Sequence, residues 1–101
     1  MDIRETHQPL SEVAALLGRH HNRVYADAVR EGWGLVRENG EWWLPKEIGQ
    51  GLRRRREDRL AEMAGEFAAG MRSRGLREDA IAQELAQFRD LIARNPEVVN
   101  V

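Results

Sequence analysis

The chain has 101 residues, a formal net charge of −1 and no cysteine. This length fits one domain, or one domain with an extension, and is too short for two independent large cores. The absence of cysteine excludes disulfides, thiolate nucleophiles and nearly all structural zinc sites. With 33% charged and 42% hydrophobic residues, the composition is typical of a helix-rich globular protein and not of a disordered one.

Charge and hydropathy along the chain limit the cellular context. The first ten residues, MDIRETHQPL, contain no apolar run after a positive segment, and no stretch approaches the roughly 18 apolar residues of a membrane span. We therefore expect a cytoplasmic protein that does not contact membranes. Residues 1–50 hold six Lys or Arg against eight Asp or Glu, and residues 51–101 hold ten against nine. A nucleic-acid-binding protein of this composition has to concentrate its positive charge locally.

Two short helices are predicted in the first third of the chain. Ser11 is the expected N-cap of the first, and Gly18 is expected to end it. Its apolar face comprises Val13, Leu16 and Leu17. The second helix ends at Gly32, and its apolar stripe comprises Val24, Tyr25, Ala28 and Val29. Together they predict a helix-turn-helix. The outward face of the second helix is predicted to carry Arg19, Asn22, Arg23, Ala26 and Arg30.

A β-hairpin is predicted over residues 35–45, LVRENGEWWLP. Asn39 and Gly40 suit the two positive φ angles of a type I′ turn, β-favouring residues flank them, and Pro45 ends the second strand. Trp42 and Trp43 must point to opposite faces of that strand, because successive side chains alternate. Trp43 is expected to pack on Trp33, on the later helices or on a second subunit.

The second half of the chain predicts a helical hairpin. Gly49 and Gly51 are expected to loosen the chain before a helix over residues 52–74, which opens with the arginine run at residues 53–56. Arg53 with Glu57 and Arg54 with Asp58 have the i, i+4 spacing of ion pairs, and reaching phosphates is the alternative role of the run. Gly75 ends this helix, and a second helix over residues 77–94 stops at Asn95 and Pro96.

These two helices carry apolar stripes that cover each other only partly. The stripes comprise Leu60, Met63, Phe67 and Met71 on the first helix, and Ile81, Leu85, Phe88 and Ile92 on the second. We expect the hairpin, residues 51–101 with its charged connecting helix, to pair with a second copy. Folding back on residues 1–50 is the alternative.

The segment GRHHNRVY, residues 18–25, concentrates polar side chains at the start of the second helix. Arg23 can donate in bidentate fashion to guanine, Asn22 can pair with adenine, and His20 can start the helix against a phosphate. A metal site would need more convergent ligands than His7, His20 and His21 supply, and acid–base catalysis would need a partner group and a pocket. We therefore predict recognition without catalysis, metal or cofactor, and a merely solvated surface is the alternative.

Residues 10–47 resemble the excisionase-like and MerR-like winged helix-turn-helix family. LSEVAALLGRHHNRVYADAVREG is similar to its S/T-x-x-x-A-x-L-L-G helix and its x-T-V-Y recognition helix ending R-x-G, and LVRENGEWWLPKE is similar to its wing ending G-R-W-x-x-P. The resemblance implies a winged helix-turn-helix domain over residues 1–50, with Trp42 in the core, the second helix in the major groove and the hairpin as a wing. With the outward face, it predicts these DNA-binding residues: Arg19, His20, His21, Asn22, Arg23, Arg30, Arg37 and Asn39.

This sequence departs from the family pattern at charged positions. Glu41 and Trp43 stand where the family often has basic residues, and Asp27 and Glu31 lie close to the path expected for phosphates. The loss of basic residues and the presence of carboxylates near phosphates both lower the affinity expected for DNA. They keep a role without DNA open.

The prediction is thus a mainly α protein that binds double-stranded DNA with sequence specificity as a homodimer. A small transcriptional regulator or an excisionase-type factor has this organisation. Two other interpretations remain open. One is an assembly protein similar to a phage terminase small subunit. The other is an antitoxin-type module that binds a protein partner through its C-terminal segment, whose apolar residues are Val98, Val99 and Val101.

Overall fold

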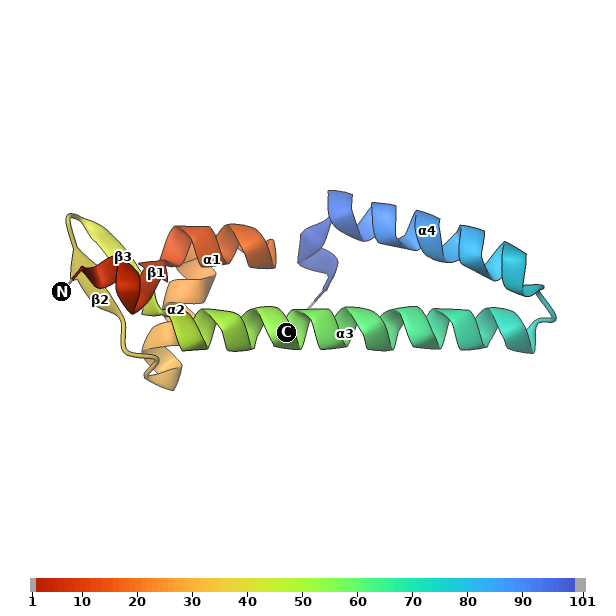
Figure 1. The fold of residues 1–101 in the computed structure, drawn as a ribbon, viewed down its shortest axis with the longest axis horizontal. Coiled ribbons are helices and arrows are strands. Elements are labelled where there is room, and N and C mark those ends of the chain that lie inside the picture. Colours follow the sequence, from red (N-terminus) through yellow and green to blue (C-terminus); the bar gives the residue numbers. More distant parts are fainter. Residues whose placement is uncertain (1, 100–101) are drawn as a thin grey trace. The chain divides into compact units, whose positions relative to one another are not determined.

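The computed structural model describes residues 2–99, which form four α-helices and a small sheet (Figure 1). A 3₁₀ turn precedes the first strand and another follows the last helix. In chain order the elements are Ile3–Glu5 (3₁₀), β1 (His7–Pro9), α1 (Leu10–Leu17), α2 (His21–Glu31), β2 (Val36–Glu38), β3 (Glu41–Pro45), α3 (Lys46–Ser73), α4 (Glu78–Arg94) and Pro96–Val98 (3₁₀). The predicted mainly α class is confirmed.

The chain divides into two compact units, Met1–Arg54 and Arg55–Val101. We call them the N-terminal and the C-terminal unit. Helix α3 contributes its first residues to the former and the remainder to the latter. Among residues 2–99, no helix combines the length and the apolar composition that a membrane span requires.

The ends of α1 and α2 follow local sequence signals, with one exception. Gly18 and Gly32 end the helices in the left-handed region, at φ 65° and 67°, as predicted. The predicted Ser11 cap is wrong, because α1 begins at Leu10 and Pro9 is its N-cap without a side-chain hydrogen bond. Pro9 is also the last residue of β1 and pairs with Trp43. The helix therefore starts directly where the strand ends.

The buried stripes of α1 and α2 are narrower than predicted. Val13 and Leu17 of α1 are buried, and so are Val24 and Ala28 of α2. Leu16, Tyr25 and Val29 belong to the predicted stripes but are exposed. Each is the sequence neighbour of a buried residue and lies about 100° away from it around the helix axis. Two short helices bury only a narrow sector of each other's surface, so these neighbours stay outside it.

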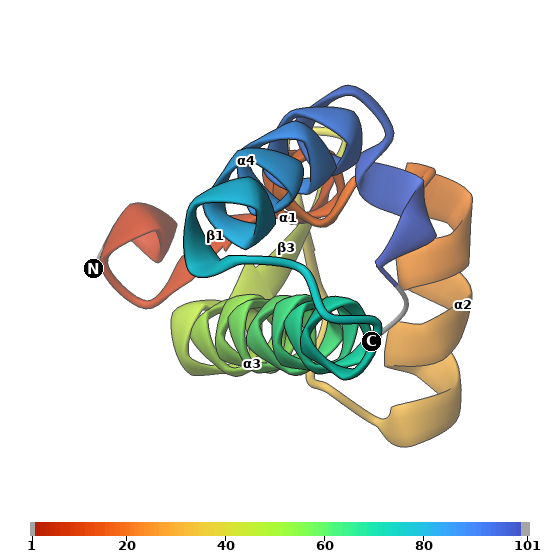
Figure 2. The same ribbon diagram turned by 90° about the vertical axis from the view of Figure 1, so that its right-hand side faces the viewer.

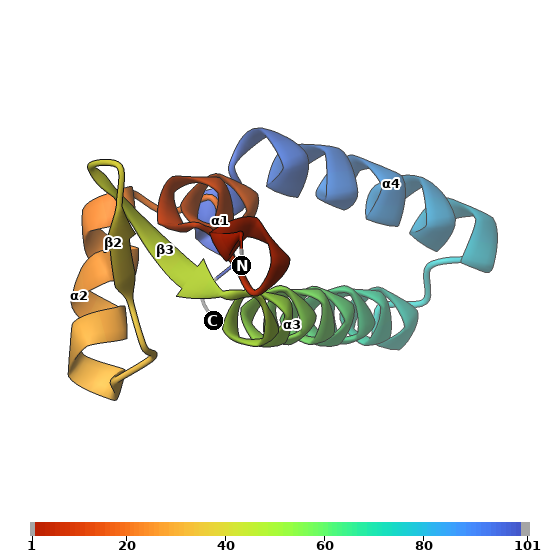
Figure 3. The ribbon, with the colours of Figure 1, turned by 60° about the vertical axis from the view of Figure 1, so that its left-hand side comes forward.

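The sheet is antiparallel, with the strand order β1-β3-β2. The predicted hairpin of β2 and β3 is confirmed (Figure 3). Asn39 and Gly40 form its turn with φ angles of 51° and 77°, and Glu38 before the turn pairs with Glu41 after it. These angles match a type I′ turn. Strand β1 was not predicted, because three residues are too few to show an alternating pattern and the strand depends on pairing with β3.

Both neighbouring tryptophans of β3 take part in packing. Trp42 is half-buried and packs with Trp33 and Leu35 against a buried cluster, which comprises Leu10, Ala14 and Val24. Trp43 is only 7% exposed, and its indole N–H donates to the Glu38 carbonyl at 3.3 Å. The resemblance makes Trp42 the core tryptophan, whereas Trp43 is the more deeply buried of the two. This chain buries Trp43 without a second subunit.

Helix α3 begins six residues earlier than predicted, at Lys46. The expected loose segment at Gly49 and Gly51 is therefore wrong. Gly49 is buried, and a Cβ atom at this position would overlap the Gln8 amide and lie 3.4 Å from the Val13 side chain. Close packing of α3 on β1 and α1 thus maintains the helix despite the low helix propensity of glycine.

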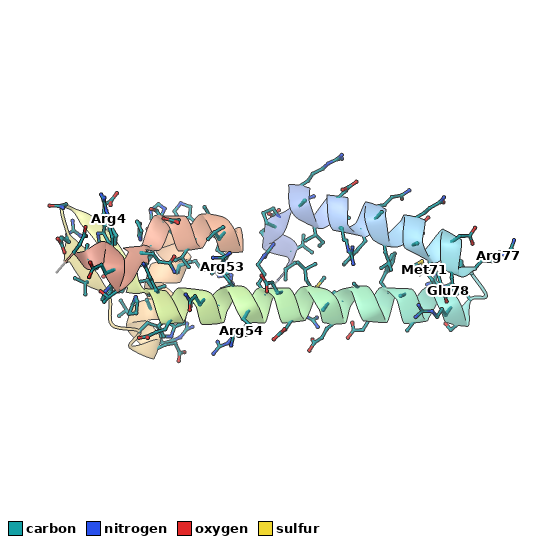
Figure 4. All side chains as sticks on the ribbon, in the orientation of Figure 1. Arg4, Arg53, Arg54, Met71, Arg77 and Glu78 are labelled. Atoms are coloured by element: carbon teal, nitrogen blue, oxygen red, sulfur yellow. The ribbon has the colours of Figure 1, made fainter. Side chains whose placement is uncertain are left out.

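The C-terminal unit is a hairpin of α3 and α4, which run antiparallel (Figures 1 and 2). Ala68 and Met71 of α3 form a buried cluster with Ile81 of α4, and Met71 points toward α4 (Figure 4). The rings of Phe67 and Phe88 are stacked with centroids 5.3 Å apart. Helix α3 ends at Ser73, one residue before the predicted end, and α4 has the predicted extent to within one residue.

Polar contacts fix both ends of this hairpin. The Arg72 guanidinium donates to the two Glu78 carboxylate oxygens at 2.7 and 3.1 Å across the turn. These bonds lower the pKa of Glu78 and raise that of Arg72. At the other end, the chain after α4 turns back toward α3, and Arg56 donates to the Pro96 carbonyl at 2.8 Å (Figure 2).

The arginine run differs from its prediction. Within residues 2–99, neither Arg53 with Glu57 nor Arg54 with Asp58 forms an ion pair, and Arg53 and Arg54 point in different directions from α3 (Figure 4). An i, i+4 pair with the basic residue first has the less favourable orientation in a helix, and exposed pairs gain little. Arg56 is the member of the run with a structural role.

Candidate nucleic-acid interface

Helix α2 begins with a histidine cap. The His20 Nδ1 atom accepts a hydrogen bond from the Asn22 backbone N–H at 3.2 Å. An accepting Nδ1 carries no proton, so the neutral ring has its proton on Nε2. The His20 and His21 rings are stacked with centroids 4.3 Å apart. His20, one of the residues predicted at the start of the second helix, is thus its N-cap, and the His20 side chain fixes where α2 begins.

Asn22 and Arg23 follow the cap and are exposed on the first turn. Among residues 2–99, neither side chain has a hydrogen bond or an ion pair. Val24 and Ala28 hold the opposite side of the helix in the core. The amide of Asn22 and the guanidinium of Arg23 are therefore available to a ligand, on a helix whose position is set by packing.

Asp27 joins two of the predicted arginines into one ion-pair network. Its carboxylate lies 3.4 Å from Arg19 Nη1 and 2.7 Å from Arg30 Nη2, and Arg30 also pairs with Glu31 at 3.3 Å. The hydrogen bond to Glu31 and the charge of Asp27 raise the pKa of Arg30. Asp27 is therefore not an isolated negative charge, since two guanidinium groups lie against its carboxylate.

Arg19 does not lie on the outward face where it was predicted. It belongs to the turn before α2, and its side chain is 14% exposed. Its contact with Asp27 attaches this turn to the helix. The i, i+3 spacing of Asp27 and Arg30 is visible in the sequence, but the contact from Arg19 depends on how the turn folds back.

The β2–β3 hairpin lies beside α2. The Arg37 guanidinium of β2 is 5.2 Å from the centroid of the Trp42 ring, and this ring contacts Tyr25 of α2 with centroids also 5.2 Å apart. A cation over an aromatic face is attracted by its electron density. Arg37 is thereby linked through Trp42 to the helix that carries Asn22 and Arg23, and Asn39 is exposed at the turn of the hairpin.

Two hollows open on the surface of the N-terminal unit. One of about 170 Å³ lies beside the start of α2 and is below the roughly 300 Å³ of a typical ligand pocket. The other measures about 380 Å³, and its cations Arg4 and Lys46 are matched by Glu12 and Glu41. Within the described residues, no three metal-ligating side chains converge. The first hollow is lined by Leu10, Ser11, His21, Glu41 and Trp42.

Most of the residues predicted to pair with a second copy pack against each other within the C-terminal unit. Met71, Ile81 and Ile92 are buried. The half-buried ones are Leu60, Met63, Leu85 and Phe88. Phe67 is exposed, and so are Leu91 and Val98, which lie outside both predicted stripes. Val101 of the predicted partner-binding tail lies outside the described residues.

The candidate interface therefore consists of the exposed side of α2 and the adjoining hairpin. Asn22 and Arg23 are unoccupied donors on α2, Arg37 and Asn39 lie on the hairpin, and Arg30 is shared with Asp27. No protein-family model matches the chain, and no curated protein or solved structure shows significant similarity to it.

Proposed function

We propose that this protein binds double-stranded DNA with sequence specificity through α2. The observation that carries the proposal is the pair of exposed, unoccupied side chains Asn22 and Arg23 on a helix whose other side is buried. In the major groove, an arginine donates in bidentate fashion to guanine and an asparagine pairs with adenine. Such contacts specify sequence, whereas contacts to phosphates only position the protein.

The order of elements supports an interpretation as a winged helix-turn-helix. Helices α1 and α2 are joined by a three-residue turn, and the hairpin follows with β3 paired to β1. In this interpretation α2 is the recognition helix and the hairpin is the wing. Arg37 then reaches the DNA backbone, and the Nε2–H of His20 donates to a phosphate at the helix start.

We further propose that the protein acts as a homodimer, as a small transcriptional regulator or an excisionase-type factor. A single α2 contacts too few bases for high affinity, whereas a twofold dimer presents two copies to half-sites roughly 34–36 Å apart. The C-terminal unit is the candidate dimerisation element, because exposed apolar side chains remain on its surface at Phe67, Leu91 and Val98. No catalysed reaction forms part of this proposal.

Selection of DNA by the full-length chain tests the proposal. The protein is incubated with a random-sequence duplex pool at near-physiological salt, and bound DNA is amplified and sequenced over successive rounds. We expect a palindromic motif with half-sites about one helical turn apart. The double variant N22A/R23A should enrich no motif. Absence of enrichment with the wild-type chain would contradict DNA reading.

A further inference from the structure

Val29 is an unusual residue for the outward side of α2. The residue is 60% exposed, the largest value for any large hydrophobic residue among residues 2–99. A β-branched residue has a lower helix propensity than alanine, leucine or the long polar residues. An exposed valine also gains little from burial. Neither packing nor helix formation explains a valine here.

Val29 continues the line of exposed residues that starts at Asn22. Asn22, Ala26 and Val29 have the spacing i, i+4, i+7, which places them along one side of the helix. Arg23 and Arg30 lie next to this line. The exposed side of α2 thus combines hydrogen-bond donors with a short apolar strip, defined as Ala26 and Val29.

We infer that the apolar strip contacts thymine C5-methyl groups and so makes Ala26 and Val29 specificity-determining residues. This inference rests on the proposed function. Thymine alone among the four bases presents a methyl group in the major groove, and apolar side chains contact it there. Both strip residues have short side chains, which allows the helix backbone to approach the bases. The longer Arg23 side chain extends beyond the strip to a neighbouring base.

Helix geometry limits what the strip reads. Residues 26 and 29 are about 4.5 Å apart along the axis, and residues 22 and 29 about 10.5 Å. With a rise of about 3.4 Å per base pair, this side of α2 covers roughly three to four pairs. Two strip residues therefore contact one or two thymines in each half-site. A protein partner would need a wider apolar surface than two small side chains between arginines.

The test replaces single thymines by deoxyuridine in the motif selected by the full-length chain, which removes only the methyl group. For the wild-type chain, at least one replacement per half-site should weaken binding by about fourfold, the equivalent of one buried methyl group. The Val29→Ala variant should show a clearly smaller difference between the thymine and uracil duplexes at that position. Leu76→Ala is the control, since Leu76 is an exposed apolar residue in the turn between α3 and α4, and it should keep the fourfold difference.

The outcomes separate this inference from the proposed function. If the chain selects a motif but no replacement weakens binding, or if Val29→Ala keeps the whole difference, the methyl contact is wrong while DNA reading stands. If no motif is selected, both fail. Because Val29 is exposed, Val29→Ala should fold like the wild type, and an unchanged circular dichroism melting curve verifies this.

Discussion

Three arginines near α2 look equivalent in the sequence but have different surroundings. Arg19 and Arg30 share the Asp27 carboxylate, whereas Arg23 has no partner among residues 2–99. An arginine in an ion pair must exchange one anion for another before it binds DNA, and Arg23 does not. At the residue scale, Arg23 is therefore the side chain on which specificity should depend most.

Replacing Arg23 by alanine should cost about 1–3 kcal/mol of binding free energy on the selected site and relax the preference at one base pair. Titration of labelled duplexes, selected and scrambled, measures both effects. Arg94→Ala, an exposed arginine of α4, is the control and should leave specificity unchanged. Equal losses on selected and scrambled DNA would show that Arg23 contacts only phosphate.

His20 should contribute to stability as the cap of α2. His20→Ala removes the acceptor for the Asn22 N–H and should lower the free energy of unfolding by about 1 kcal/mol, whereas His20→Asp keeps an acceptor and should lower it less. Urea unfolding followed by tryptophan fluorescence reports this, because Trp33, Trp42 and Trp43 all lie in the N-terminal unit. Equal stability of His20→Ala and the wild type would mean that the cap is not significant.

At the element scale, α3 shows how packing extends a helix beyond its local signals. Gly49 and Gly51 favour a break, yet the helix runs through both. Gly49 is buried under Gln8, while a Cβ at Gly51 would have no atom within 4 Å. These two glycines of α3 thus differ in their packing, and of the two only Gly49 is needed for the close approach of α3 to Gln8.

Substitution of each glycine by alanine tests this difference. Gly51→Ala should raise the free energy of unfolding by roughly 0.5–1 kcal/mol, because alanine favours a helix. Gly49→Ala should gain less or lose stability, because the Gln8 amide has to move. Urea unfolding monitored by fluorescence measures both, and Gln8→Ala in the Gly49→Ala background should restore the gain. Equal gains in the two single variants would contradict the close packing at Gly49.

At the scale of the whole molecule, the distribution of apolar surface suggests where a second copy would bind in the proposed homodimer. Most of the predicted pairing stripe is used inside the C-terminal unit, where Met71 and Ile81 are buried. Leu91 remains 58% exposed on α4. Apolar side chains left on the surface of a small hairpin favour association, so dimerisation should depend on Leu91 more than on the buried stripe.

Leu91→Glu should weaken the dimer by roughly ten- to a hundredfold, since burying a leucine contributes about 1.5–3 kcal/mol. Analytical ultracentrifugation of the full chain over a range of concentrations measures this. Leu16→Glu, an equally drastic change at an exposed leucine of α1, is the control and should remain dimeric. A Leu91→Glu chain that is still dimeric would place the interface elsewhere, and a ring larger than a dimer would favour the assembly protein.

Features coded by neighbouring residues were predictable from the sequence. Gly18 and Gly32 end helices, Asn39 and Gly40 form the tight turn, and Asn95 with Pro96 stops α4. Each depends on backbone preferences within a few residues. For the same reason, the exposure of Asn22 and Arg23 followed from the periodicity of α2 alone.

Only the tertiary structure decided the features that depend on distant residues. Strand β1 exists because β3 pairs with it, and α3 starts at Lys46 because Gly49 packs under Gln8. Arg19 is occupied by Asp27, eight residues later, and Trp43 is buried in its own unit. Strand pairing and burial depend on contacts between residues that are far apart in the sequence and that the fold brings together. Local sequence patterns do not specify these contacts.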